Sequence, residues 1–218
     1  MNRFIRTAAL LGAVAAFSGR ANAESLKVDA DKGNSTLSAV FDAPLGERIM
    51  AVSNAVGCDL TWDDKGMTMS GTCSVPLTAI RVDNDDTKSD HFRQWATNKK
   101  GKEKTCKLSA KFTGIKPDKA LVAEQPVSFS GDVPFTICDR AREDGKPEHV
   151  TGTVVLLPGD KKILRIRAHV DQFDREAYHV GPKWTDGWLA RVQGLAKVVA
   201  AQGAIDLNLF AAANEPAK

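Results

Sequence analysis

Apolar and polar residues alternate with a period of two along much of this chain, and this pattern limits the available folds more than any other feature. In the segment 106–112, Lys107, Ser109 and Lys111 separate apolar residues at every other position. Such alternation is typical of a β-strand with one face on an apolar interior and the other in water. The apolar members of this segment are Cys106, Leu108, Ala110 and Phe112.

The same alternation predicts several other strands. Their ranges are 27–41, 127–137, 151–157, 163–170 and 205–209. Strands that follow one another through polar turns favour an antiparallel sandwich or barrel. The predicted inward residues of the first two are Leu37, Ala39, Phe41, Val127, Phe129, Gly131, Val133, Phe135 and Ile137.

Two stretches depart from this pattern. Residues 83–96 are polar and then aromatic, which predicts a short helix over a loop. In 186–202, Trp188, Val192, Leu195 and Val199 recur at helical spacing, so we expect one helix before the last strand.

The N-terminus has the three regions of a secretory signal peptide. Arg3 and Arg6 precede an apolar run over 8–17, and small residues stand at Ala21 and Ala23. We therefore expect export to the periplasm, or secretion, with cleavage after Ala23. This leaves one domain over 24–213 and a flexible tail over 214–218, with no apolar run long enough to cross a membrane.

Charge argues against a nucleic-acid partner. Arg3, Arg6 and Arg20 leave with the signal peptide while no acidic residue does, so the mature chain has no net formal charge. Proteins that bind nucleic acid generally need a basic surface.

The cysteines fit two structural disulfides. Four cysteines in an exported chain indicate two bridges, with three possible connectivities. If Lys65 and Gly66 form a two-residue hairpin loop, Cys58 falls opposite Cys73. Cys106 then joins Cys138 by elimination.

A series of short motifs follows in order along the mature chain. Ser35 and Phe41 lie in the opening strand, and Gly57, Leu60 and Asp63 lead into a turn. The later motifs are the strand 74–82, the pair His91 and Phe92, the strand 105–113 with Phe112, the strand 131–135, and the set Arg175, Tyr178, Val180 and Gly181.

In this order the motifs resemble the YceI-like family of periplasmic, lipocalin-like β-barrel proteins that bind polyisoprenoids or related amphipathic lipids. The sequence departs from the family pattern where Phe92 replaces Leu, Cys106 stands in place of Pro, and His179 replaces Gly.

The resemblance implies an antiparallel lipocalin-like barrel that holds an amphipathic lipid, such as an isoprenoid or a quinone, without a cofactor. The tail would lie inside, with the headgroup near His91 and Arg175. His91 on an exposed helix surface, and Arg175 in a surface ion pair with Asp174 or Glu176, are the alternatives. The ligand-binding residues expected are Leu37, Ala39, Phe41, Leu77, His91, Phe92, Ala110, Phe112, Phe129, Phe135, Arg175 and Tyr178.

Two other functions stay open at this stage. One is an envelope interaction or structural protein with a packed core, whose partner docks on the segment 184–199. The other is a hydrolase built on one of the four histidines, although the chain lacks the Gly-x-Ser-x-Gly, His-Glu-x-x-His and phosphate-loop motifs.

Overall fold

The computed structural model describes residues 23–97, 104–181 and 199–213, and these form a mainly β structure. Thirteen strands join in one sheet, and every ladder between them is antiparallel. The strands are β1 Ala23–Val28, β2 Thr36–Asp42, β3 Arg48–Ser53, β4 Gly57–Asp63, β5 Thr68–Pro76, β6 Arg81–Val82, β7 Lys107–Ile115, β8 Pro126–Val133, β9 Phe135–Ile137, β10 Arg140–Ala141, β11 Glu148–Leu157, β12 Ile163–Asp174 and β13 Gln202–Ala213.

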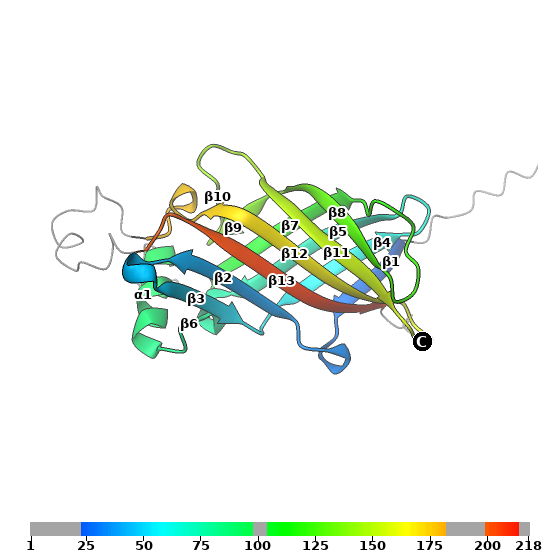
Figure 1. Cartoon of the computed structure of the whole chain (residues 1–218), viewed down its shortest axis with the longest axis horizontal. Helices are drawn as coiled ribbons and strands as arrows, with labels where there is room; N and C mark the ends of the chain where they lie inside the picture. The colour runs from blue at the N-terminus through cyan, green and yellow to red at the C-terminus, as the bar shows by residue number, and fades with distance from the viewer. Residues whose placement is uncertain (1–22, 98–103, 182–198, 214–218) are drawn as a thin grey trace, which may run out of the picture.

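The sheet curls into a barrel-like shape. Its strand order is β10-β9-β7-β5-β4-β1-β13-β12-β11-β8, and β2, β3 and β6 branch from β13. β13 pairs with β2 through residues 203–208 and with β1 through residues 211–213. The two ends of the barrel are therefore built differently: β2, β3, β6 and the helix α1 (Asp86–Thr97) form one end, and β1 and β4 contribute to the other (Figure 1).

The ring of strand ladders is incomplete between β7 and β8. In the described part of the chain, single backbone hydrogen bonds cross this interval, from Lys111 N–H to the Pro134 carbonyl (3.0 Å) and from Asp118 N–H to the Ser128 carbonyl (2.8 Å). Pro134 also divides the predicted strand 127–137 into β8 and β9, because a proline has no N–H to give to a ladder.

The predicted strand 27–41 is likewise two strands. A 3-10 turn at Ala30–Lys32 separates β1 from β2, and it starts where the Asp29 carboxylate accepts the Asp31 N–H at 2.9 Å. Such local side-chain bonding competes with a ladder, and this ends β1. The strands predicted at 151–157, 163–170 and 205–209 are confirmed within β11, β12 and β13, and the helix predicted within 83–96 is α1.

The predicted helix over 186–202 lies largely outside the described residues. Its described end is not helical, because Gln202 already begins β13. No helix in the described part of the chain is long and apolar enough to span a membrane.

Both expected disulfides are present. Cys58 pairs directly with Cys73 across β4 and β5, which we call the hairpin disulfide. The loop between these strands has four residues, 64–67, instead of two, but the register is the predicted one because the loop is extended symmetrically. Cys106 and Cys138 form the strand-end disulfide, which joins the start of β7 to the end of β9. Two disulfides are typical of proteins in an oxidising, exported environment.

Candidate ligand-binding site

A hollow of about 230 Å³ lies in the barrel at the end that carries α1. β2, β3, β7, β12 and β13 supply apolar walls, and α1 adds Phe92 and Trp95. The polar side chains of the lining are Glu47, Lys88, His91 and Arg175. Because Glu47 and Lys88 are exposed, they mark the mouth of the hollow. An apolar cavity with a few polar groups at its mouth is the usual form of a small-molecule site.

The structure brings seven of the predicted ligand-binding residues together around this hollow. They are Leu37, Ala39, Phe41, Leu77, His91, Phe92 and Arg175. Three others, Ala110, Phe112 and Phe135, line a second and smaller hollow of about 30 Å³ deeper in the barrel. These ten residues therefore surround two neighbouring spaces in one interior.

The remaining two predicted residues lie apart from both hollows. Phe129 is buried and packs beside Gly152 on the neighbouring strand, where its ring fills the space that a larger residue would take. Tyr178 is fully buried and stacks on Phe173, with ring centroids 4.9 Å apart.

Sequence reasoning missed several lining residues, and one signal would have found one of them. Trp95 stands one helical turn after His91, and their rings stack with centroids 6.5 Å apart. Ile49 and Ala51 also line the hollow, but Met50 and Val52 beside them are apolar too, so the sequence of β3 shows no period of two that would mark them.

The Arg175 side chain makes its hydrogen bonds to backbone carbonyls. It is 6 % exposed, and its guanidinium donates to the carbonyls of Ala200 (3.0 Å), Val180 (2.7 Å) and Val199 (2.8 Å). An ion pair with Glu176 spans 3.3 Å. Burial lowers the pKa of the guanidinium from its ordinary value. Arg175 thus borders the hollow mainly as a clamp between the end of β12 and the start of β13.

Tyr178 belongs to a buried polar cluster. Its hydroxyl donates to Glu148 Oε1 at 2.7 Å, and Arg142 pairs with the same oxygen at 2.9 Å. The hydrogen bond to Glu148 raises the pKa of Arg142, while burial and then the bond to Glu148 raise the pKa of Tyr178. These two donors offset the cost of burying the Glu148 carboxylate, which is only 4 % exposed.

Lys88, one of the two exposed charged residues at the mouth, is held in an ion pair. Lys88 Nζ lies 2.7 Å from Asp83 Oδ2, and this hydrogen bond raises the pKa of Lys88. Asp83 Oδ1 in turn accepts the Met50 N–H at 2.8 Å, which fixes the carboxylate at the edge of β3. His91 is half-buried, stacks on Trp95 and lines the hollow.

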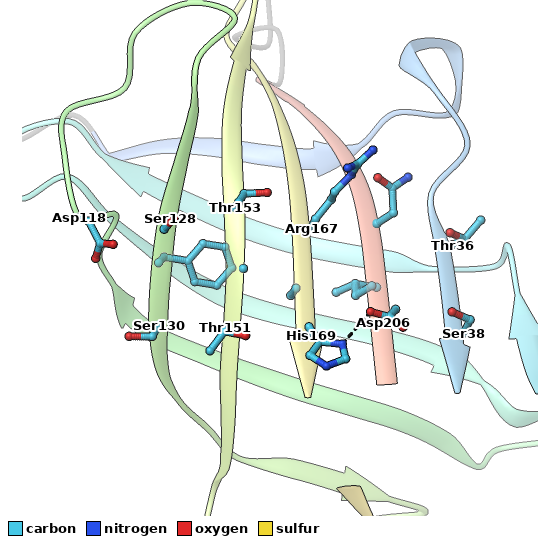
Figure 2. A pocket seen from close by; sticks show the side chains of 15 residues that line it. Thr36, Ser38, Asp118, Ser128, Ser130, Thr151, Thr153, Arg167, His169 and Asp206 are labelled. Carbon is cyan, nitrogen blue, oxygen red and sulfur yellow. Dashed lines mark hydrogen bonds and ion pairs between the residues drawn. The ribbon is translucent and has the colours of Figure 1, made fainter. Parts of the chain in front are cut away.

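A wider but open and polar concavity of about 660 Å³ lies on the outer face of β2, β13, β12, β11 and β8. Figure 2 shows its side chains projecting from adjacent strands, with His169 bonded to Asp206 at 2.8 Å. Thr151 is the cross-strand neighbour of His169. The histidine side chain is 41 % exposed. This face has the composition of the solvated side of an antiparallel sheet.

Comparison with known proteins supports the fold. No family model matches the chain, and no curated protein matches it. A solved polyisoprenoid binding domain from Saccharophagus degradans, implicated in plant cell wall breakdown, matches with a TM-score of 0.56 at 13% identity. The match covers 88% of this chain and 99% of that one. At this identity the likeness shows a shared β fold.

Proposed function

We propose that this protein is a non-enzymatic, YceI-like binding protein of the periplasm, exported by a signal peptide cleaved after Ala23. It holds an amphipathic lipid, such as an isoprenoid or a quinone, with the tail in the barrel and the headgroup beside His91. The observation that carries this proposal is the apolar hollow under α1. The structural likeness to a polyisoprenoid binding domain supports the same ligand class.

The tail supplies most of the binding free energy in this proposal. Each methylene that enters the hollow contributes about 0.8 kcal/mol, whereas an exposed headgroup ion pair contributes about 1 kcal/mol or less. Lys88 is paired with Asp83, and Arg175 is bonded to backbone carbonyls. This pairing supports a headgroup with little net charge, such as a quinone or an alcohol, over a diphosphate.

The first experiment is native mass spectrometry of protein purified from the periplasm of its own host, followed by organic extraction. We expect a chain that starts at Glu24, carries two disulfides, and releases a stoichiometric lipid on denaturation. A folded protein with nothing extracted, even after incubation with quinones and polyprenyl phosphates, contradicts lipid binding.

Variants that fill the hollow test the site itself. Ala39 and Ala51 face each other across β2 and β3, and both line the hollow. Ala39→Phe and Ala51→Phe are expected to abolish lipid retention. Ser38→Phe is the matched control, because Ser38 lies on the same strand and lines the outer face. Equal loss of lipid in Ser38→Phe would show that the effect is not specific to the hollow.

An envelope interaction protein is the second candidate. The barrel end opposite α1 is solidly packed, with Leu26, Leu60 and Leu164 each at most 1 % exposed, as a purely structural barrel requires. The docking segment expected for this function, 184–199, lies almost wholly outside the described residues. Lipid-free protein that captures one envelope partner stoichiometrically would favour this function.

A further inference from the structure

The two hollows in the barrel share a wall of three side chains. Leu37, Leu108 and Ile205 line both the main hollow and the deeper one. They come from β2, β7 and β13, and each is less than 9 % exposed. We call these three side chains the partition.

The order of inward residues along the strands places the partition across the depth of the barrel. Along β13, Ile205 borders both hollows, Leu207 borders the deeper one, and Leu209 beyond it is 1 % exposed. β12 repeats this order: Phe173 lines the main hollow and Val170 the deeper one. From α1 inwards, the interior is thus a hollow, a partition, a second hollow and a packed end.

We propose that the partition sets the length of the apolar chain that this protein accepts. This inference rests on the proposed function. An apolar cavity of about 150 Å³ holds one benzene, so the main hollow has room for about nine carbons, or about two isoprene units. A longer chain meets the partition and gains no further burial.

Leu108 is the partition residue whose truncation best joins the two hollows. Its neighbour two residues along β7, Ala110, already lines the deeper hollow with Phe112 and Phe135. A change to Ala removes three carbons and connects this space to the main hollow, which makes room for about four more carbons. Each buried methylene is worth about a fourfold gain in affinity, so the upper limit for one added isoprene unit is a few hundredfold.

The test is calorimetric titration of the full mature protein with prenyl alcohols of two, three and four isoprene units. In the native protein we expect affinity to change by less than about threefold from two units to three. In Leu108→Ala the same step is expected to raise affinity by about tenfold or more. Ile205→Ala is a second variant with the same expectation, in case Leu108→Ala does not fold.

Leu164→Ala is the matched control, because Leu164 is fully buried but lines neither hollow. It should keep the native dependence on chain length. If the affinity of the native protein rises tenfold with each added isoprene unit, the partition does not limit chain length. The same conclusion follows if both partition variants keep the native dependence on chain length. Either result overturns this inference and leaves the proposed function intact. Failure of every prenyl alcohol to bind the native protein overturns lipid binding itself, and the chain-length inference with it.

Discussion

Ionisation of Tyr178 is expected to be possible only after the protein unfolds. Tyr178 is the one tyrosine in the chain, so its titration is free of overlap with any other tyrosine. Its side chain is fully buried and donates to Glu148 at 2.7 Å. Burial disfavours the charged phenolate, and the hydrogen bond to Glu148 and the charge of that carboxylate favour the neutral hydroxyl, so the pKa of Tyr178 lies above its ordinary value.

The magnitude follows from the linkage between ionisation and folding. In the unfolded chain the tyrosine loses its proton near pH 10, whereas the folded chain keeps it. The stability that this difference provides is fully present below pH 10 and falls as pH rises, by about 1.4 kcal/mol for each pH unit above 10. At pH 11, unfolding is therefore favoured by about 1.4 kcal/mol more than at neutral pH through Tyr178 alone.

The assay combines tyrosinate absorbance with urea unfolding at several pH values. The folded protein should show no tyrosinate signal until circular dichroism reports unfolding, and the denatured protein should titrate near pH 10. Tyr178→Phe should lower the free energy of unfolding by about 1–3 kcal/mol at neutral pH, because Glu148 loses a hydrogen-bond donor. This variant should also show a shallower loss of stability above pH 10. A reversible tyrosinate titration near pH 10 in folded protein would refute the burial and bonding of this residue.

Three further predictions concern the clamp, the disulfides and the hollow. Gly181→Ala should lower the free energy of unfolding, measured in urea, by at least about 1 kcal/mol more than Gly145→Ala. Both glycines have left-handed φ angles, of 116° and 70°, but of the two only Gly181 would place a Cβ against the Arg175 guanidinium. Equal losses of stability in the two variants would show that the Arg175 side chain can move aside without destabilising the protein. Removal of the strand-end disulfide should destabilise the protein by about 0.7 kcal/mol more than removal of the hairpin disulfide, because it closes 32 residues instead of 15. The reverse order would point to native strain in place of loop entropy. A prenyl alcohol should shift the tryptophan emission, and Trp95→Phe should remove this shift, since Trp95 lines the hollow. A shift that persists in Trp95→Phe would place the ligand elsewhere.

Alternation in the sequence predicts which way side chains point, and the structure follows it closely. Leu108, Ala110 and Phe112 are buried while Lys107 and Lys111 are exposed. The register of the cysteine hairpin is also predictable, because cross-strand pairs in a hairpin follow from the position of the turn. Both properties depend on residues close together in sequence, which is why the sequence alone indicates them.

Alternation does not predict how deep an inward residue lies. Leu37 and Phe129 both follow an inward pattern, yet Leu37 borders two hollows and Phe129 packs against Gly152. Depth depends on the stagger of strands around the barrel and on which side chains meet from opposite walls. The partition brings together β2, β7 and β13, which are far apart in the chain, so only the folded structure shows it.

In the motif of Arg175, Tyr178, Val180 and Gly181, the polar side chains bond to the protein itself, so they are not free to select a ligand. Arg175 bonds three backbone carbonyls, Gly181 leaves room for its guanidinium, and Tyr178 completes the cluster around Glu148. A ligand headgroup that recruited Arg175 would have to replace these bonds with equally good ones, because a buried guanidinium without partners is costly. Discrimination between ligands is therefore expected to depend on the shape and length of the apolar hollow more than on headgroup charge. This is why chain length, varied at a constant headgroup, is the more decisive probe of the site.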